Sequence, residues 1–371
     1  MTAPAPAPAP APLTPPVFGR FFLPGPTDVH PEVLAAMQRP MIGHRSSAME
    51  QLLAGMQPRL ARLFRTTRTV LVGTASATGF MELAVRNGVR RRALSLVNGS
   101  FSERFAHLVR ACAKECVRLD VPLGCAIEPD MLRDALRRTP VDAVTLVHSE
   151  TSTGVLQDVE ALAAVVREFD DVLLLVDAVT SVAGSPVEPD RWALDFVLTG
   201  SQKALALPPG LALGVASERM LERAKTLPAR GLYFDLVSFT EATTKHQPTN
   251  TPAISLLFAL EAQLGRIDRE GGAEGRWRRH DAMRRRVEAW SEQRGVAYLP
   301  REGRRSWTVS CLKLPDGTSA KRIVSGLKDA GWTIGSGYGP LQDSTIRIGH
   351  MGDHTVGAVE ELLALLDGLL S

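Results

Sequence analysis

The sequence predicts an α/β fold with a large domain built on a mainly parallel sheet and a smaller α+β domain towards the C-terminus. Short apolar segments such as Val172–Val176 alternate with amphipathic segments of helical length. Strands that are apolar on both faces are typical of parallel sheets covered by helices on both sides. After about residue 252 this alternation stops, and a length of 371 residues suits one large and one smaller domain.

The chain begins with a segment that cannot build a core. Residues 3–16 read APAPAPAPAPLTPP, and alternating Ala-Pro favours the extended polyproline II conformation. We expect residues 1–16 to form a flexible arm and the folded part to begin near Val17. Two amphipathic helices are predicted next, at Pro31–Arg39 and Ser47–Phe64.

The alternation that follows defines the sheet of the large domain. Its strands are short, rich in aliphatic residues and mostly followed by Gly or a polar residue. The predicted strands are Thr69–Val72, Ala93–Val97, Glu115–Leu119, Ala143–Val147, Val172–Val176, Phe196–Thr199 and Leu211–Ala216. The helices expected between them are Phe80–Asn87, Phe101–Cys112, Glu128–Arg138 and Val159–Glu168.

A second domain is predicted from the change in pattern near residue 252. The helix Ala273–Gln293 carries many Arg residues interspersed with acids, which indicates a solvated helix face. We expect residues 17–265 to form the large domain and residues 266–371 the small one. The other elements expected here are helices Pro252–Leu264, Ser319–Ala330 and Val356–Leu370, with strands Trp307–Leu312 and Thr345–Ile348.

Composition excludes several classes of protein. A net charge of +3 gives no electrostatic reason to expect nucleic acid as a partner. No stretch reaches the roughly 18 apolar residues of a membrane span, and the N-terminus lacks the charged start and apolar core of a secretory signal. Four cysteines without disulfide or zinc spacing predict reduced thiols in a cytoplasmic protein, and no metal site is expected. They are Cys112, Cys116, Cys125 and Cys311.

Residues just after the strands are the candidates for chemistry, because ligands of a doubly wound sheet bind beyond the carboxyl ends of its strands. Ser76, Ala77 and Thr78 follow the first strand and precede a helix. Small residues let backbone N–H groups approach an anion, and a helix N-terminus attracts one. These residues are therefore a candidate phosphate cradle, and the alternative interpretation is an ordinary capped helix start.

Two further strands end in charged residues. Asp177 ends the strand Val172–Val176, where it serves either a cationic ring nitrogen or a structural cap or ion pair. Lys203 follows the strand Phe196–Thr199 and precedes an apolar run, where burial lowers the pKa of an amine and favours attack on a carbonyl. A lone lysine at such a place is more often a surface residue. A lysine, a carboxylate and a phosphate cradle together are the set that pyridoxal 5′-phosphate requires.

Eight short segments, taken in order and spacing, carry a resemblance to a known family. They are Pro24-Gly25-Pro26-Thr27, Gly43-His44-Arg45, Asn98-Gly99-Ser100-Phe101, Glu150-Thr151-Ser152-Thr153-Gly154-Val155, Val176-Asp177-Ala178-Val179, Thr199-Gly200-Ser201-Gln202-Lys203-Ala204, Pro208-Pro209-Gly210 and Ile346-Arg347-Ile348-Gly349. From about Phe22 to Gly352 the chain resembles the class V aminotransferases of fold type I. Within them it is most similar to the alanine–glyoxylate and serine–pyruvate aminotransferase branch.

The resemblance implies the fold of the PLP-dependent transferases of type I, with a mainly parallel sheet of the seven-stranded type. It implies that Lys203 holds pyridoxal 5′-phosphate as a Schiff base and moves the proton, while Asp177 pairs with the pyridine nitrogen. It also implies that Phe101 stacks on the pyridine ring. The residues it assigns to the phosphate are Ser76, Ala77, Thr78 and Gln202, and Ser152 or Thr153 would lie near the ring hydroxyl.

The resemblance implies substrate contacts as well. Arg347 would grip the substrate carboxylate with its planar guanidinium, and the backbone at Gly25 would help define that pocket. His44 either contacts a substrate side group or fixes the entry loop. We expect Gly335–Pro340 to be a mobile loop leading to the strand of Arg347, since it lacks the spacing of a dinucleotide loop.

A homodimer with shared active sites is also implied, because in this family a segment of the neighbouring subunit completes the phosphate site. The corresponding segment here is residues 247–252. Relatives often carry Tyr-x-x-Thr-x-Pro, whereas this chain has Gln247 and Asn250 at the two variable places. Asn250 and Thr251 are the candidates for reaching the cofactor of the partner.

The function that follows is transfer of an amino group from a small amino acid, of the alanine or serine type, to a keto acid such as glyoxylate or pyruvate. A 2-aminoethylphosphonate–pyruvate transaminase or another class V enzyme is the alternative. A cysteine desulfurase needs a reactive Cys on a mobile loop, whereas Cys311 lies in a predicted strand. Two further alternatives are a non-catalytic binding module and a nicotinamide oxidoreductase. The intact Lys203, Asp177 and Arg347 disfavour the first, and the absence of a Gly-rich fingerprint disfavours the second.

Overall fold

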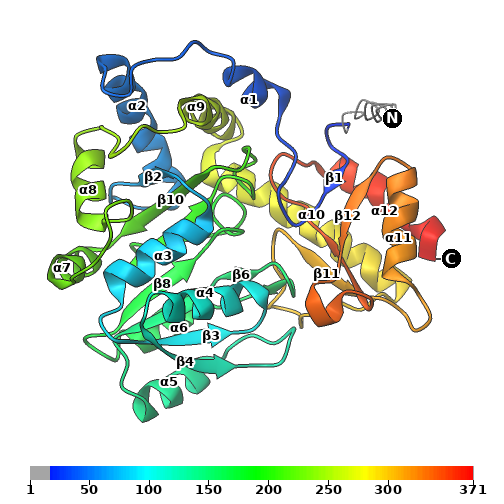
Figure 1. Cartoon of the computed structure of the whole chain (residues 1–371). Coiled ribbons are helices and arrows are strands. Elements are labelled where there is room, and N and C mark those ends of the chain that lie inside the picture. Colours follow the sequence, from blue (N-terminus) through cyan, green and yellow to red (C-terminus); the bar gives the residue numbers. More distant parts are fainter. Residues whose placement is uncertain (1–16, 371) are drawn as a thin grey trace, which may run out of the picture.

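The computed structural model describes residues 17–370, so the predicted Ala-Pro arm at residues 1–16 lies outside the described residues. Figure 1 shows two sheets with their own helices, joined by the long helix α10 (Gly272–Arg294). The expected α/β class and the mainly parallel sheet are both confirmed. None of the helices within residues 17–370 combines the length and apolar character that crossing a bilayer would need.

The larger sheet has seven strands in the order β2-β10-β9-β8-β5-β3-β4. All pair in parallel except β10, which runs antiparallel to both of its neighbours. The carboxyl ends of the parallel strands therefore meet at one edge, as a ligand site requires. The strands are β2 (Leu71–Thr74), β3 (Arg92–Val97), β4 (Glu115–Asp120), β5 (Ala143–Val147), β8 (Leu173–Asp177), β9 (Phe196–Gly200) and β10 (Leu211–Ala216).

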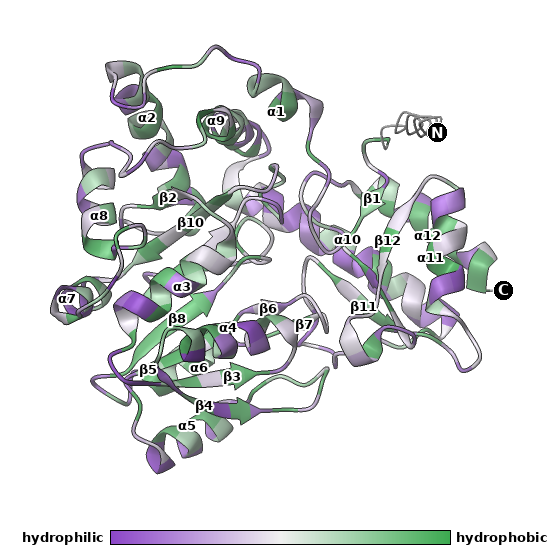
Figure 2. Ribbon diagram, viewed as in Figure 1, coloured by the Kyte–Doolittle hydropathy of each residue, from purple (hydrophilic) through white to green (hydrophobic). Residues whose placement is uncertain are grey.

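Alternation along the strands builds a core on each face of this sheet. In β8, Leu174 and Val176 join one apolar cluster, while Leu173 and Leu175 join the other, since successive side chains point to opposite faces. Figure 2 shows hydrophobic residues along the strands and hydrophilic ones on outer helices. One face is covered by α2 (Ser47–Phe64), α5 (Pro129–Arg138), α6 (Val159–Val166) and α9 (Ile254–Arg269), and the other by α3 (Ala77–Gly88), α4 (Ser100–Ala111), α7 (Glu218–Thr226) and α8 (Leu236–Thr244).

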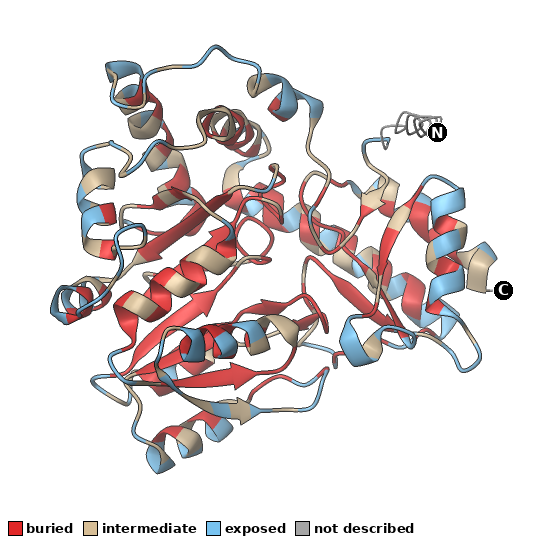
Figure 3. Ribbon diagram, in the orientation of Figure 1, coloured by how far each residue is buried: buried red, intermediate tan, exposed pale blue. Residues whose placement is uncertain are grey.

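The second sheet has four strands in the order β1-β12-β13-β11 and a separate apolar core. Its helices pack their apolar faces on this core and leave their outer faces to solvent, as Figure 3 shows. The remaining elements are β1 (Phe21–Phe22), α1 (Pro31–Ala36), β11 (Ser310–Lys313), α11 (Ala320–Asp329), β12 (Thr333–Ser336), a 3-10 turn at Gly339–Leu341, β13 (Thr345–Ile348), α12 (Val356–Leu370) and the small ribbon of β6 (Ser149–Glu150) and β7 (Val155–Leu156).

Four features differ from the expectations. Residues 335–336, expected in a mobile loop, belong to β12, which pairs with β13 on one side and β1 on the other. Helices α7 and α8 were not predicted, and the strand expected at Trp307–Leu312 begins only at Ser310. Finally, β1 lies in the second sheet although its residues fall within the range expected for the large domain. The division of the chain between residues 265 and 266 stays a prediction.

Candidate active site

Lys203 lies in the turn between β9 and β10, at the carboxyl end of β9. Ser201 shapes this turn, because its backbone N–H donates to the Leu211 carbonyl at 2.9 Å and its hydroxyl donates to the Pro208 carbonyl at 2.8 Å. The lysine is 7% exposed, and its Nζ donates to the Pro24 carbonyl oxygen. The turn thus points a primary amine into the protein rather than into solvent.

The segment 23–27 packs directly on this lysine. The Thr27 backbone N–H donates to the Gln202 carbonyl at 3.1 Å, and its hydroxyl donates to the Lys203 carbonyl at 3.2 Å. Gly25 has a φ of +114°, and a Cβ atom there would overlap the end of the Lys203 side chain. Only glycine satisfies both conditions. The predicted substrate residue Gly25 is therefore in contact with the amine-bearing side chain.

Asp177 ends β8, the strand that pairs in parallel with β9. Its side chain is 3% exposed, and Oδ1 accepts the Val179 backbone N–H at 2.8 Å. Burial is the main cause that raises the pKa of this carboxyl, to about 7. A carboxylate held in such surroundings is stabilised by a cationic partner, which is what a protonated ring nitrogen would supply.

Burial acts on Lys203 in the opposite direction. It lowers the pKa of the amine to about 8, with the charge of Arg347 as the next cause, while Asp177 and Glu150 oppose the shift. A sizeable neutral fraction near physiological pH follows, and the neutral amine is the nucleophile towards a carbonyl. The pair of shifts marks this edge of the sheet as chemically unusual.

A cavity of about 150 Å³ lies beside these two residues. The structure brings seven of the predicted cofactor residues to its wall, and their roles stay predictions. These seven are Ser76, Ala77, Thr78, Phe101, Asp177, Gln202 and Lys203. Residues to which the sequence analysis gave no role in the site also line it, namely Met81, Arg104, Val147, Ser149, Thr151, Val179 and Thr180.

The first turn of α3 forms the polar end of this cavity. Its N-cap residue Ser76 makes no side-chain hydrogen bond to the helix, so the first N–H groups lack the usual capping acceptor. Such a helix N-terminus is suited to a phosphate group. The Phe101 ring lies on another side, with its centroid 5.6 Å from Lys203 Nζ. A phosphate end, an aromatic face, a buried carboxylate and a buried amine together fit pyridoxal 5′-phosphate.

Arg347 approaches from β13 of the second domain. Its Nε donates to the Ser336 carbonyl at 2.9 Å, and one Nη donates to the Thr151 carbonyl at 3.1 Å. The other Nη makes no hydrogen bond within residues 17–370. Tyr338 lies 5.5 Å from the guanidinium carbon, and its ring centroid is 6.2 Å from that of Phe101. The arginine is thus anchored at two atoms. It does not line the Lys203 cavity, although its charge acts on Lys203.

Ser152 and Thr153 do not line the Lys203 cavity. They line a neighbouring open cavity of about 490 Å³, together with Tyr338. The Ser152 hydroxyl donates to Glu150 at 2.6 Å, and the Thr153 hydroxyl is buried without a partner. In the tight turn between β6 and β7, Thr151 is the residue at the Lys203 cavity. Sequence spacing cannot tell which residue of such a turn points inward.

Three predicted residues lie apart from the Lys203 cavity in the single chain. Asn250 and Thr251 are exposed and line a separate small cavity beside Tyr233, with the Asn250 amide donating to the Thr249 hydroxyl at 3.3 Å. His44 is half-buried and accepts from Arg45 Nε at 3.3 Å. The connection between α1 and α2 that carries it runs along the outer edge of the molecule (Figure 1).

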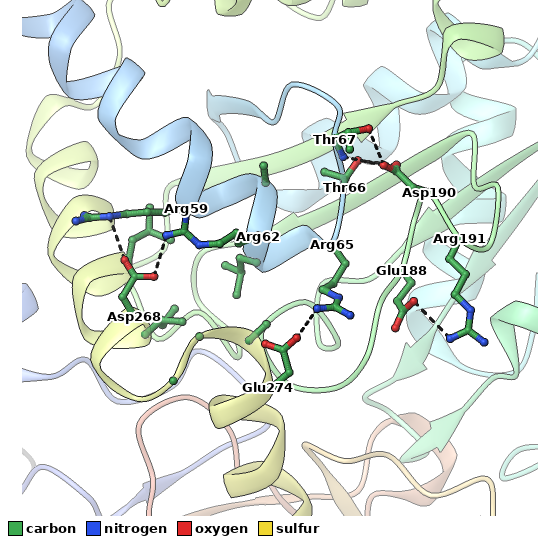
Figure 4. A pocket seen from close by; sticks show the side chains of 17 residues that line it. Arg59, Arg62, Arg65, Thr66, Thr67, Glu188, Asp190, Arg191, Asp268 and Glu274 are labelled. Carbon is green, nitrogen blue, oxygen red and sulfur yellow. Dashed lines mark hydrogen bonds and ion pairs between the residues drawn. The ribbon is translucent and has the colours of Figure 1, made fainter.

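A larger cavity, of about 770 Å³, lies between the end of α2 and the start of α10. Figure 4 shows that its arginines are already paired with acids, for example Arg59 and Arg62 with Asp268 at 3.1 and 3.3 Å. Arg65 pairs with Glu274 in the same way. Within residues 17–370 no group of three or more His, Cys, Asp or Glu side chains is placed to hold a metal ion. The Lys203 cavity is the stronger candidate.

Comparison with known proteins shows the family of the chain. The model of the class V aminotransferases matches residues 21–340, and the chain belongs to that family. It is accordingly a PLP-dependent aminotransferase, and the resemblance given on sequence motifs is confirmed.

Among its curated relatives is an uncharacterized aminotransferase of Methanocaldococcus jannaschii, 36% identical over 93% of this chain and 90% of the relative. The L-aspartate–glyoxylate aminotransferase of Paracoccus denitrificans is 30% identical over 90% of this chain and 86% of the relative. The serine–glyoxylate aminotransferase of Methylorubrum extorquens is 30% identical with the same two coverages.

Solved structures of the same class superpose closely on this fold. An alanine–glyoxylate aminotransferase from Nostoc gives a TM-score of 0.92 at 28% identity, covering 98% of both chains. An aspartate aminotransferase from Thermus thermophilus gives 0.87 at 32% identity, covering 95% of this chain and 99% of its own. The expected type of fold is thereby confirmed.

Proposed function

We propose that this aminotransferase moves an amino group from a small amino acid, of the alanine or serine type, to a keto acid of the glyoxylate or pyruvate type. The observation that carries the proposal is the juxtaposition of Lys203, Asp177 and Phe101 at one cavity. Relatives named as serine–glyoxylate and aspartate–glyoxylate aminotransferases support glyoxylate as acceptor. The neighbouring Nostoc structure supports alanine as donor.

Pyridoxal 5′-phosphate, when bound, supplies an aldehyde that captures an amine and a ring that withdraws electrons from the adjacent carbon. We propose Lys203 as the amine that holds it and Asp177 as the partner of its ring nitrogen. Phe101 would stack on the ring. Ser76, Ala77, Thr78 and Gln202 would hold the phosphate, and Ser152 or Thr153, which lie in the neighbouring cavity, are retained only as candidates for the ring hydroxyl.

Lys203 is also proposed to carry the proton of the reaction. Its Nζ is buried, and a pKa near 8 lets this nitrogen both accept and release a proton at neutral pH. The charge of Arg347 lowers the pKa of this amine, and the charge of Asp177 raises it. The chain would thus supply proton transfer at one atom whose basicity is set by its neighbours.

Arg347 is proposed to orient the substrate. Two of its nitrogens are fixed by carbonyl oxygens, so the guanidinium loses little freedom when the third binds a carboxylate. The segment at Gly25 packs against the end of the Lys203 side chain. Buried walls at the Lys203 cavity would keep water away from the reacting carbon.

A homodimer with shared active sites is part of the proposal. Asn250 and Thr251 are exposed and do not line this chain's own Lys203 cavity, as expected of residues that serve a partner. We also propose a cytoplasmic location, since none of the four cysteines forms a disulfide.

Replacement of the proposed amine is the direct test. Lys203→Ala should remove the visible absorbance of bound cofactor and lower turnover of alanine or serine with glyoxylate by about a thousandfold or more. Lys225→Ala, which changes an exposed lysine paired with Glu222, is the matched control and should behave as the wild type. Full activity in Lys203→Ala would refute the assignment.

Another activity of the family is tested by substrate choice. The wild-type protein should turn over alanine or serine with glyoxylate faster than 2-aminoethylphosphonate with pyruvate, and the reverse order would favour the alternative. Cysteine desulfuration has less support, because Cys311 lies buried in β11 and burial raises the pKa of its thiol to about 11. Such a thiol stays protonated and immobile.

A further inference from the structure

Glu150 is a buried carboxylate that the proposed reaction does not use. Its side chain is 0% exposed, and no arginine, lysine or histidine within residues 17–370 forms an ion pair with it. Instead its oxygens accept hydrogen bonds from two segments that are distant in sequence. These are the backbone N–H groups of Phe101 at 3.1 Å, Ser102 at 2.9 Å and Ser152 at 3.1 Å, and the hydroxyls of Ser102 at 3.1 Å and Ser152 at 2.6 Å.

The first of these segments is the N-terminus of α4, which needs an acceptor from elsewhere. Its N-cap residue is Gly99, which has no side chain to accept the first N–H groups. A carboxylate at that place satisfies the N–H groups and complements the positive end of the helix dipole. A Cβ atom at Gly99 would overlap Glu150, so the glycine makes room for the carboxylate. Glu150 therefore caps a helix that begins 50 residues earlier in the chain.

The second segment is the turn that carries Thr151. Ser152 is held to Glu150 by both its N–H and its hydroxyl, which fixes the turn. Within that turn, the Thr151 carbonyl accepts a hydrogen bond from Arg347 at 3.1 Å. One carboxylate thus anchors both the backbone of Phe101 and the carbonyl that holds Arg347.

We propose that Glu150 is a positioning residue, which sets the ring of Phe101 and the guanidinium of Arg347 in one fixed arrangement around the Lys203 cavity. This inference rests on the proposed function, since it assigns the ring to the cofactor and the guanidinium to the substrate carboxylate. Glu150 itself does not line the cavity. The negative charge of Glu150 also raises the pKa values of Lys203, Asp177 and Arg347, so it acts on all three groups.

The test compares Glu150→Gln with the wild type, because glutamine keeps the shape of glutamate but has no charge. Its NH₂ group is a donor, so it cannot accept hydrogen bonds from the backbone N–H groups. In the protein freed of cofactor, amide hydrogen exchange at Phe101 and Ser102 should quicken by about tenfold or more, as loss of charge-assisted hydrogen bonds implies. In the loaded protein, the visible circular dichroism of bound pyridoxal phosphate should change. The KM for the amino donor should rise by about tenfold while kcat changes less.

Two further variants keep the interpretation clear. Glu168→Gln removes an exposed carboxylate that pairs with Arg133, and it should leave every readout unchanged. Ser152→Ala removes one hydrogen bond to Glu150 and the acceptor of the Ser100 N–H at 3.0 Å, but it keeps the charge. In the cofactor-free protein it should quicken exchange at Phe101 and Ser102 to a smaller extent. It also serves as the test if Glu150→Gln does not fold.

The outcomes separate this inference from the proposed function. If the amides of Phe101 and Ser102 exchange in Glu150→Gln at the rate of the wild type, the positioning role is overturned. If Glu150→Gln does not fold, the same comparison is made with Ser152→Ala. Exchange that quickens equally across the whole chain would also overturn the positioning role, since it would indicate general destabilisation. Failure of the wild-type protein to transaminate would contradict the proposed function, whereas local exchange in the cofactor-free protein would still report on Glu150.

Discussion

Asp177 and Lys203 lie at the carboxyl edge of the sheet, and burial shifts their pKa values in opposite directions. For Asp177 burial favours the neutral acid, and for Lys203 it favours the neutral amine. Without a ligand, both charges are held at a cost to the fold. A cofactor with a cationic nitrogen and an aldehyde would relieve both costs, so binding and stability should be linked at this site.

The cost at Asp177 predicts a pH-dependent gain in stability for Asp177→Asn in the cofactor-free protein. The pKa of this carboxyl is about 7 in the folded chain, against an ordinary value of 3.8. Below about pH 4 the carboxyl is protonated in both states and costs no stability. As the pH rises from about 4 to about 7 only the unfolded chain loses the proton, so the free energy of unfolding falls. Above pH 7 the variant should be more stable, by up to about 4 kcal/mol, and below pH 4 it should match the wild type. Urea unfolding at a series of pH values measures the difference.

Asp281→Asn is the control of opposite sign. Burial alone would raise the pKa of Asp281, but Arg284 and Arg285 lower it overall. Its replacement should therefore destabilise the protein at neutral pH and have no effect in acid. If both variants respond alike, the electrostatic account of Asp177 is wrong.

Gly25 gives a second prediction at the scale of single residues. Gly25→Ala adds a methyl group that overlaps Lys203 and imposes strain at positive φ, whereas Gly19→Ala adds strain at a φ of +91° with open space around it. We expect Gly19→Ala to cost about 1 kcal/mol in stability. Gly25→Ala should cost more and should also slow recovery of the visible cofactor band when the cofactor-free protein is mixed with pyridoxal phosphate. If the two variants lose the same stability and recover the cofactor band at the same rate, the close contact between Gly25 and Lys203 does not affect cofactor binding.

At the scale of elements, the start of α3 differs from the start of α11. Ser76 caps nothing, whereas Ser319 accepts the Arg322 N–H at 3.3 Å as the N-cap of α11. Ser76→Ala should therefore leave the stability of the cofactor-free protein unchanged but weaken its affinity for pyridoxal phosphate. Ser319→Ala should do the reverse and cost about 1 kcal/mol. Thermal unfolding and cofactor titration measure the two effects, and a stability loss in Ser76→Ala would contradict the vacant cap.

Helices and strands could be predicted from the sequence where the hydrophobic periodicity and the length of a segment indicate the same type of element. All seven strands of the large sheet were anticipated, since most are short apolar runs and Glu115–Leu119 alternates apolar with charged residues, and ligand chemistry could be placed at their ends. The strand β12 was missed because Thr333–Ser336 contains a glycine and runs into another at Gly337, a composition typical of a loop. That strand forms because β1 and β13 pair with it on both sides, which no local pattern encodes.

The candidate site shows the same limit. Lys203 and Asp177 could be brought together from sequence because adjacent parallel strands end at one edge. Which residue of the turn 150–154 faces the cavity depends on the side chains that Glu150 binds, so Thr151 was passed over in favour of Ser152 and Thr153. Glu150 was missed because its partners lie about 50 residues away.

At the scale of the whole molecule, the proposed sharing of sites predicts recovery of activity in mixed dimers. Lys203→Ala and the double variant Asn250→Ala with Thr251→Ala should each be weakly active alone. In a hybrid, the subunit with an intact Lys203 receives an intact segment 247–252 from its partner. Co-refolding equal amounts should restore about a quarter of wild-type activity, since half of the dimers are hybrids with one complete site.

The matching experiment uses the two changes in one chain. A triple variant co-refolded with an equal amount of wild type leaves every hybrid site incomplete, so activity should be about a quarter of that of wild type alone and come from the wild-type homodimers. Activity of about half there, or no recovery in the first mixture, would place residues 250 and 251 in the site of their own subunit. Sedimentation of each mixture confirms that the subunits have exchanged.

The two-residue strand β1 closes the exposed edge of β12 and is followed directly by the segment that touches Lys203. A shortened protein that starts after Phe22 would leave β12 with unpaired N–H and C=O groups, which invite pairing between molecules. Protein engineers who trim the proline-rich beginning should therefore stop before Phe21. Beyond that point, the same cut would promote aggregation and also loosen the packing around Lys203, the proposed catalytic lysine.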